Sequence, residues 1–363
     1  MPGLSYEQNT QADAAPGLRV PPLLHEIKQG TVLGIDVGYS KRLRTTCLCL
    51  LKWSDEDVRL SLKKVGIDEQ ERARAIGSMF PEPTDCNAVA IDGPLTRDFR
   101  VVSDYRAADA LLSRGVFQKR GKPGQTSAPV GQKLHEHATR LAKLVLDGAT
   151  PDRFAVARST HIEPISEFAI VEAFPNAFLA SAIDDQCFPE LNRDASRWRR
   201  RKSDQYWVHL AKSGGLTKIL AALLPHHRLD TTNPYWEISI HGSMEHSFPA
   251  RAKLEDIRGH DERAALVCAL TALAVATESS IGVGDPEYGD IFLPPVTLWG
   301  ASRSRAQPWF EIALRENIAT TMKDTSIVNH QRARVRFHGS YWIPAPCQCF
   351  QKEVGLETTG EGP

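Results

Sequence analysis

A short apolar run that ends on an acid is the feature that most restricts how this chain can fold. Residues 31 to 37, TVLGIDV, are apolar enough for a buried strand, and Asp36 stands near its end, two residues before Gly38. A buried carboxylate loses hydration, which costs free energy unless a cation or a hydrogen-bond donor meets it. Asp36 is therefore either a turn residue, a role that Asp often has, or a ligand of a metal ion.

A second acid follows a second run of the same kind. Residues 86 to 91, CNAVAI, predict another buried strand, and Asp92 comes directly after it. The chain between the two runs predicts two strands and a helix, at residues 45–53, 58–62 and 68–79. Three antiparallel strands followed by a right-handed crossover place the fourth strand parallel to the first and beside it. We therefore expect Asp36 and Asp92 at the carboxyl ends of neighbouring strands, about 4.8 Å apart, where such sheets bind ligands.

Two further acids occupy positions that suit the same site. Glu172 lies inside a fifth predicted strand, residues 168–174, where an ion or a fixed basic partner would offset its burial. Asp261 opens a strongly apolar helix over about residues 261–279, and it can cap that helix and bind a metal at the same time. Glu262 is a weaker substitute for Asp261.

The kinds of side chain in this set indicate which metal it would hold. Acids without a cluster of Cys or His favour the hard cations Mg²⁺ or Mn²⁺, one or two of them, over zinc. In a carboxylate site these ions support in-line phosphoryl displacement. We interpret four acids as both catalytic residues and metal ligands: Asp36, Asp92, Glu172 and Asp261. His260 is interpreted as a surface residue that could assist a leaving group.

Five segments, taken in their order and spacing, resemble a known protein family. They are GIDVGYSK, AVAIDGPL, IVEAFPNAF, GHDERAALVCALTA and GDPEYGDIFLPP. They are similar to the family catalogued as domain of unknown function 429, whose members are described as predicted nucleases with a ribonuclease H-like fold. The resemblance covers roughly residues 31 to 299. It implies that the same four acids, on the first, fourth and fifth strands and at the start of the final helix, form the family's site.

The resemblance and the order of the elements together predict an architecture. We expect an α/β, ribonuclease H-like domain at residues 29–299, with a five-stranded mixed sheet in the order 3-2-1-4-5 flanked by helices. A helical insertion is expected at about residues 175–258, and a C-terminal accessory segment at residues 300–363. Residues 1–28 are polar and rich in Gly, Pro and Ala, which predicts a disordered or loosely packed segment.

One position departs from the family pattern. Relatives often carry a second acid three residues after the acid that opens the final helix, whereas this chain has Ala264 there. Residues three apart share a helix face, so one ligand is missing from that face. The resemblance therefore leaves open either weakened two-metal catalysis or a single-metal site.

Two basic segments are candidates for binding a polyanionic substrate. One is a loop at residues 118–127, and the other, residues 197–204, combines five cations with a Trp, which suits phosphates and unstacked bases. The alternative is that these cations only solvate a helix face or a loop. The candidate substrate-binding residues are Lys119, Arg120, Lys122, Arg199, Arg200, Arg201 and Lys202.

The composition limits where any affinity for nucleic acid can come from. Lys plus Arg and Asp plus Glu both number 44, so the affinity must come from local patches rather than from net charge. The longest apolar run, residues 264–276, is too short to span a bilayer, and seven scattered cysteines do not resemble a disulfide framework. We therefore expect a cytoplasmic protein whose partner is nucleic acid, either DNA or RNA, and not a membrane.

Two other functions are compatible with the sequence. Sugar kinases and chaperone ATPases hold phosphate with a D-x-G turn after a first strand, which Asp36 to Gly38 could form. Their architecture needs a second such half, and the sequence has no second strand followed by D-x-G. The other alternative is a non-catalytic member of the fold that binds nucleic acid or a partner protein through the basic segments.

Overall fold

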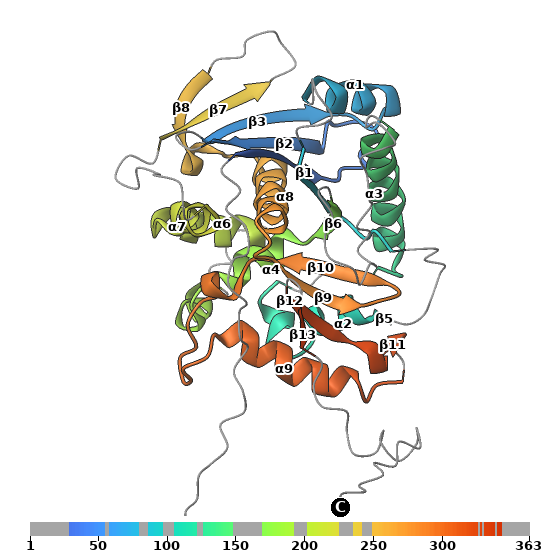
Figure 1. Ribbon diagram of the computed structural model, residues 1–363, viewed down its shortest axis with the longest axis vertical. Helices are drawn as coiled ribbons and strands as arrows, with labels where there is room; N and C mark the ends of the chain where they lie inside the picture. The colour runs from blue at the N-terminus through green and yellow to red at the C-terminus, as the bar shows by residue number, and fades with distance from the viewer. Residues whose placement is uncertain are drawn as a thin grey trace, which may run out of the picture.

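An eleven-stranded mixed sheet occupies the centre of the part of the chain that the computed structural model describes (Figure 1). The described residues are 29–54, 58–79, 86–96, 105–121, 126–147, 169–191, 202–224, 235–241, 249–325, 327–328, 330–337 and 340–342. From one edge to the other, the strands are β13 (Ser340–Trp342), β12 (Arg334–Phe337), β9 (Ile281–Asp285), β10 (Gly289–Leu293), β6 (Ala169–Ala173), β4 (Ala88–Asp92), β1 (Gly30–Asp36), β2 (Thr46–Trp53), β3 (Val58–Val65), β7 (Tyr235–His241) and β8 (Pro249–Lys253). A separate two-stranded sheet pairs β5 (Tyr105–Arg106) with β11 (Ile327–Val328).

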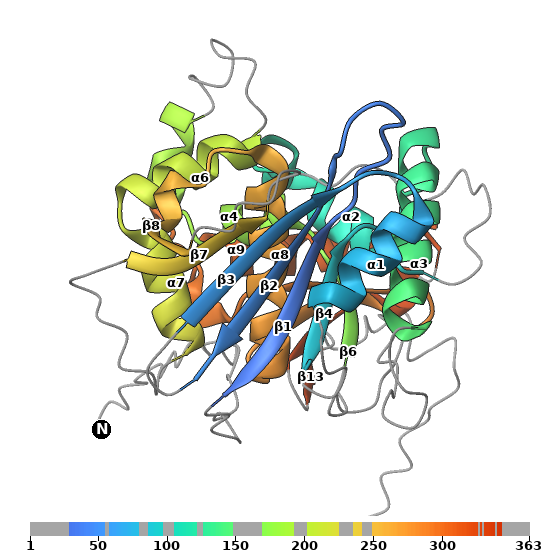
Figure 2. The same ribbon diagram turned by 90° about the horizontal axis from the view of Figure 1, so that it is seen from above.

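The helices of the described residues pack on both faces of this sheet. They are α1 (Glu69–Met79), α2 (Ala107–Ser113), α3 (Pro129–Asp147), α4 (Pro175–Ser181), α6 (Lys202–Lys212), α7 (Gly215–Leu223), α8 (His260–Ala276) and α9 (Trp309–Thr321). Near β1, helices α1 and α3 cover one face and α8 covers the other (Figure 2). None of these helices combines the length and hydropathy that crossing a membrane requires.

The α/β class with a mixed sheet is confirmed, whereas the prediction of a five-stranded sheet is wrong. The five predicted strands are β1, β2, β3, β4 and β6, and they form the run β3-β2-β1-β4-β6 inside the larger sheet. The order of the whole sheet differs because β7 and β8 continue it beyond β3, and four strands continue it beyond β6. Unpaired edges of a sheet leave backbone N–H and C=O groups to be satisfied, and strands from distant parts of the chain pair with them here.

Strands also appear in the regions predicted to be an insertion and an accessory segment. Between residues 175 and 258, the described part holds α4, α6 and α7 and also the strands β7 and β8. After residue 300, it holds α9 together with β12 and β13, which pair with the central sheet through β9. Both regions therefore contribute to the central sheet. The predicted N-terminal segment, residues 1–28, lies outside the described residues.

The alternation of side chains along β1 divides the core into two parts. Leu33 and Ile35 pack with α1 and α3, whereas Val32 packs on the side of α8. On the α8 side the helix lies unusually close to the strand, because Gly34 has no side chain. A Cβ atom at Gly34 would lie 2.1 Å from the Ala265 carbonyl oxygen and 2.1 Å from the Ala269 nitrogen.

The close packing of α8 on β1 predicts that Gly34→Ala is strongly destabilising. Its Cβ would overlap backbone atoms, which cannot rotate away, and overpacking typically costs about 1–3 kcal/mol and occasionally more. We expect the free energy of unfolding, measured by urea denaturation, to fall by about 3 kcal/mol or more. The control is Gly77→Ala on α1, where a Cβ has no neighbour within 4 Å. Gly77→Ala should raise stability by about 0.5–1 kcal/mol, and equal effects at both positions would contradict the close approach.

Candidate functional site

Asp36 and Asp92 lie side by side at the carboxyl ends of two parallel strands. They are the last residues of β1 and β4, and they are register partners. Register partners on adjacent strands point to the same face and lie about 4.8 Å apart. That face is the one covered by α8, since Val32 and Ala90, an even number of residues away, belong to the core on that side. This is the arrangement that the crossover argument predicts, and we refer to these two residues as the acid pair.

Helix α8 passes close to both carboxylates. The thiol of Cys268, on α8, has a pKa well above its ordinary value, first because it is buried and then because Asp92 and Asp36 are near. Burial also raises the pKa of Asp92, to about 7, and the charge of Glu172 adds to this rise while that of His260 opposes it. Asp92 can therefore carry a proton near neutral pH, which is a property of residues that take part in proton transfer.

The first turn of α8 brings two more acids to the same row of the sheet, where they meet Lys64. The row is set by register, because Asp36 is opposite Cys47 and Cys47 is opposite Lys64. The Lys64 ammonium lies 3.0 Å from a carboxylate oxygen of Glu262 and 3.4 Å from one of Asp261. Asp261 thus lies on the predicted side of the sheet, with its charge balanced by a lysine.

Glu262 lies on the same side of the sheet as the acid pair, and its charge acts on the same thiol as that of Asp36. Its Oε2 atom is buried and has no hydrogen-bond partner among the described residues. Burial raises the pKa of the Cys47 thiol, and the charges of Glu262 and Asp36 are both close enough to raise it further. Sequence reasoning ranked Glu262 below Asp261 because a helix-opening pair of acids does not reveal which one faces the sheet. Ala264, on the next turn of the same helix face as Asp261, is buried and apolar.

An Asp–His contact that sequence reasoning did not predict flanks the acid pair. His260 Nδ1 lies 3.2 Å from an Asp204 carboxylate oxygen, and Arg263 donates to the same oxygen, also at 3.2 Å. Although burial alone would raise it, these two partners lower the pKa of Asp204. Asp204 lies on α6, and only the tertiary structure brings that helix to the start of α8. The His260 side chain is 26% exposed and is hydrogen-bonded to Asp204.

Glu172 is not brought to the acid pair. Its register partner on β4 is Ile91, whereas Asp92 is opposite Ala173, so the Glu172 side chain points to the other face of the sheet. There it is only 3% exposed and forms a two-pronged ion pair with Arg106, whose Nη1 donates at 2.8 Å. The Leu95 N–H also donates to it, at 3.1 Å. Of the two compensations that the sequence allowed for Glu172, the structure shows the fixed basic partner.

The ion pair of Glu172 belongs to a buried network that holds the loops beside the acid pair. Arg106 Nε donates to Asp109 at 2.9 Å, and the Thr126 N–H donates to the other oxygen of Asp109 at 3.0 Å. Because Leu95 follows Asp92 by three residues, the network fixes the chain just beyond β4. Glu172 thus acts on the acid pair through loop position and charge.

Most of the predicted substrate-binding cations are either engaged within the fold or outside the described residues. Arg120 lies over the rings of Phe188 and Trp309, at 4.4 Å and 4.5 Å, and also pairs with Asp185. It is therefore a packing residue, which corrects the prediction. Lys202 donates to the carbonyl oxygen of Lys119, whose own side chain is exposed. Four of the predicted cations lie outside the described residues: Lys122, Arg199, Arg200 and Arg201.

The oxygen donors around the acid pair suit a divalent cation in kind, although in the described part of the chain they are not gathered into a complete site. Within the described residues, no three His, Cys, Asp or Glu side chains are grouped closely enough to hold a metal ion as they stand. The acid pair nevertheless offers hard oxygen donors on adjacent strands, and the unpartnered Oε2 of Glu262 is a further donor at the same end of the sheet. Oxygen donors of this kind fit Mg²⁺ or Mn²⁺. Asp261 and Glu262 are turned toward Lys64, which supplies positive charge to them in the structure.

Comparison of the chain with protein-family models, curated proteins and solved structures found no match. The acid pair is therefore interpreted from its own geometry and chemistry.

The raised pKa of Asp92 predicts a specific pH dependence of stability. Its carboxyl has an ordinary pKa of 3.8 and a folded value of about 7, so between these values the folded protein binds a proton that the unfolded chain lacks. The resulting stability is present below about pH 4 and is lost as the pH rises through about 7. Asp92→Asn should therefore gain stability relative to wild type as the pH rises from about 4 to 8, by about 4 kcal/mol over the whole range. Urea denaturation in EDTA measures this, with exposed Glu69→Gln as the control; parallel wild-type and Asp92→Asn profiles would contradict it.

The buried network predicts that Arg106 and Glu172 are required for stability rather than for binding metal. Arg106→Leu leaves the carboxylates of Glu172 and Asp109 buried without their partner, which should cost about 3–5 kcal/mol. Arg140→Leu, which removes an exposed pair with Glu136, should cost less than about 1 kcal/mol. Calorimetric titration with Mn²⁺ should show that folded Glu172→Gln still binds the ion, because Glu172 reaches the acid pair only through its charge and the loop it holds. A clear loss of Mn²⁺ affinity in folded Glu172→Gln would restore Glu172 as a metal ligand.

Proposed function

We propose that this protein is a metal-dependent nuclease that hydrolyses phosphodiester bonds in nucleic acid at the acid pair. The observation that carries the proposal is the register of Asp36 with Asp92 beneath the first turn of α8. The run β3-β2-β1-β4-β6, with α8 packed across it, also supports assigning a ribonuclease H-like core to the larger sheet. The five motifs that resemble domain of unknown function 429 agree with the same proposal.

In this proposal the acid pair holds Mg²⁺ or Mn²⁺, with Glu262 as a further ligand. A bound divalent ion supplies Lewis acidity to the phosphoryl oxygens and makes a bound water more acidic. The protein contributes the placement of its carboxylates, which is set by the strand register and by the close packing of α8 on β1. Position 264 is Ala, and the two nearby acids Asp261 and Glu262 are balanced by Lys64. The site therefore has enough carboxylate ligands for one ion rather than two.

Proton transfer in this proposal uses residues that the structure places beside the acid pair. Asp92, whose pKa is close to 7, can accept or release a proton at its carboxyl during the reaction. His260 is held by Asp204 at 3.2 Å, and its charge lies near enough to Asp92 to lower the pKa of that carboxyl. Asp204 therefore positions His260, and Arg263 holds the same Asp204 oxygen at 3.2 Å.

One observation favours a second candidate function. No ready-made group of three metal ligands occurs in the described residues, as expected for a non-catalytic member of the fold that binds nucleic acid. Such a protein would bind nucleic acid equally well with and without a chelator and would cut none. The two functions are separated by measuring binding and cleavage on the same preparation.

The test of the nuclease proposal is Asp36→Asn in a cleavage panel. The panel contains single-stranded, double-stranded and branched DNA and RNA, each with Mg²⁺, Mn²⁺ or EDTA. Asp36→Asn keeps the shape of the side chain and removes its charge. Losing an outer partner of a metal site reduces activity by about 10- to 100-fold, and losing a direct ligand should reduce cleavage by more than that. Its urea midpoint should be equal to that of wild type or higher, because repulsion with Asp92 is relieved.

The matched control is Glu316→Gln, which makes the same change of acid to amide at an exposed position of α9. This variant should cleave as wild type does. Equal cleavage by Asp36→Asn and wild type, or no cleavage of any substrate with either metal, would end the nuclease proposal. In the second case, retained binding in EDTA would establish the non-catalytic function instead.

A further inference from the structure

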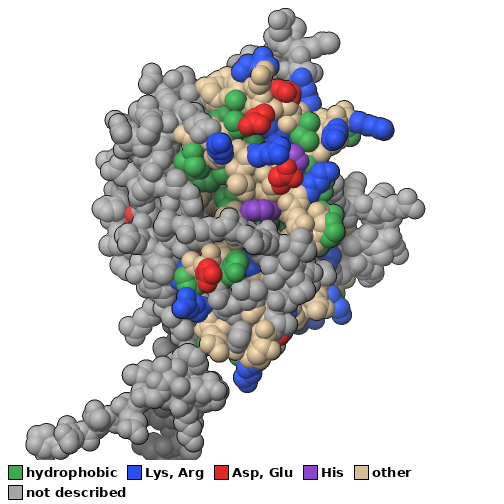
Figure 3. Space-filling view, turned by 90° about the vertical axis from the view of Figure 1, so that its right-hand side faces the viewer, with side chains coloured by type: hydrophobic (Ala, Val, Ile, Leu, Met, Phe, Trp, Pro, Cys, Tyr) green, Lys and Arg blue, Asp and Glu red, His purple; other side chains and the backbone are tan. Residues whose placement is uncertain are grey.

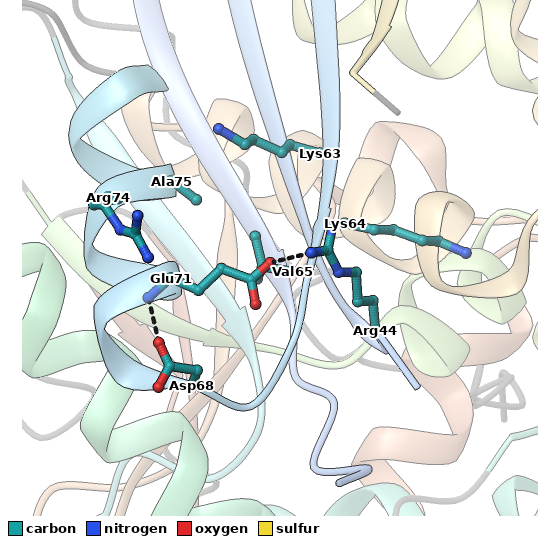
Figure 4. Close-up of a pocket in the computed structure, with 8 residues that line it drawn as sticks. All are labelled: Arg44, Lys63, Lys64, Val65, Asp68, Glu71, Arg74 and Ala75. Carbon is teal, nitrogen blue, oxygen red and sulfur yellow. Dashed lines mark hydrogen bonds and ion pairs between the residues drawn. The ribbon is translucent and has the colours of Figure 1, made fainter. Parts of the chain in front are cut away.

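A basic pocket opens where β3 ends and α1 begins. Its volume is about 470 Å³, within the range of about 300–1,000 Å³ that small-molecule sites occupy. Its charged lining consists of Arg44, Lys63, Lys64, Arg74, Asp68 and Glu71. Figure 4 shows that Lys64 points away from α1, as expected from its contacts with Asp261 and Glu262, whereas Lys63 reaches toward the helix.

The two acids of the basic pocket are already satisfied within the fold. Glu71 pairs with Arg44 at 3.3 Å and accepts the Gly66 N–H at 3.1 Å. Asp68 accepts the Glu71 N–H at 2.7 Å, as an N-cap residue does at the start of a helix. Their negative charge is therefore directed to an arginine and to backbone donors.

Two of the cations, in contrast, have no ion-pair partner among the described residues. Lys63 Nζ donates only to the Ser78 hydroxyl, at 3.0 Å, and an ammonium has three donors. Arg74 Nε donates to the Gln70 carbonyl oxygen at 3.3 Å, which leaves the terminal nitrogens of an exposed guanidinium for another acceptor. The basic pocket thus retains positive charge and strong donors that suit a phosphate. On the surface formed by α1 and α3, Lys and Arg side chains gather with fewer acids among them (Figure 3).

The basic pocket and the acid pair lie at the same end of the sheet. Lys64 is two strands from Asp36 in the same row, through Cys47, which corresponds to about 10 Å. Lys63 precedes Lys64 and points to the opposite face of the sheet, the one covered by α1. The pocket and the acid pair therefore lie on opposite faces, at the same end of the sheet.

We infer that the basic pocket binds a backbone phosphate of the nucleic-acid strand, away from the bond that is cut, through Lys63 and Arg74. The inference rests on the proposed function, since it places the strand that the acid pair would cut. Arg44 lies at the pocket edge, is half exposed, and can turn from Glu71 to the same phosphate. The pocket therefore supplies affinity and register along the strand, whereas the acid pair supplies the chemistry.

The test measures binding without chemistry. Fluorescence anisotropy of a labelled single-stranded oligonucleotide, DNA in one arm and RNA in the other, is recorded with the full chain in EDTA over a series of salt concentrations. The variant Lys63→Gln/Arg74→Gln should bind about tenfold more weakly or worse, and the slope of log affinity against log salt should fall by about 1.4, or about 0.7 for each lost contact. The control, Lys212→Gln/Lys218→Gln, removes two exposed charges from α6 and α7 and should leave both quantities unchanged.

Each outcome decides the inference. Equal salt slopes for the pocket variant and the control would overturn it. A mononucleotide or inorganic phosphate that binds wild type as tightly as the strand does would assign the pocket to a free phosphate ligand and would also overturn it. Cleavage with unaltered binding in the pocket variant would refute this inference and leave the nuclease proposal standing. Strand binding that needs Lys63 and Arg74, with no cleavage of any substrate, would support the pocket and refute the nuclease.

Discussion

The close approach of α8 to β1 is the contact on which the candidate site depends. Gly34 lets the helix backbone reach the strand, because any larger side chain would overlap Ala265 and Ala269. A helix held this closely crosses the sheet at a fixed height, so its first turn meets the row that contains Asp36. Asp261 and Glu262 are acidic residues at a helix N-terminus, where the helix dipole favours negative charge. The same packing that completes the core on this face therefore also gathers carboxylates at its end.

The charges at this end of the sheet are arranged in two separate systems. On the α8 face, Asp36, Asp92 and the first turn of α8 bring negative charge together, with Lys64 as the described cation that balances it. On the other face, Glu172 is neutralised by Arg106 within a buried network. Both systems lie in a low-dielectric environment, where unbalanced charge is costly. The buried network is complete, whereas the acid pair keeps a carboxyl with a raised pKa and a nearby unpartnered oxygen of Glu262. That difference is why we interpret the acid pair as functional and the network as structural.

Reasoning from the sequence was most accurate where local rules decide the outcome. Apolar runs located β1 and β4, and the crossover rule placed Asp36 beside Asp92. It failed for Glu172, because the face on which a side chain lies depends on strand register, and a shift of one residue reverses it. It failed again for Arg120, whose guanidinium packs over two aromatic rings from distant segments. The strands β7, β8, β9 and β10 were missed because pairing with a sheet edge is decided between segments far apart in the chain.

The sequence by itself determined the α/β class, the central strands and the acids at their ends, because apolar periodicity and chain connectivity are local properties. Only the tertiary structure decided which of those acids share a site. Glu172 and Asp92 both belong to strands that end in apolar surroundings, yet register sends them to opposite faces. Asp204 reaches His260 across 56 residues, and Lys64 reaches Glu262 from another strand. Charge balance in a folded protein is set by which side chains packing brings within a few ångströms of each other, and that information is distributed over the whole chain.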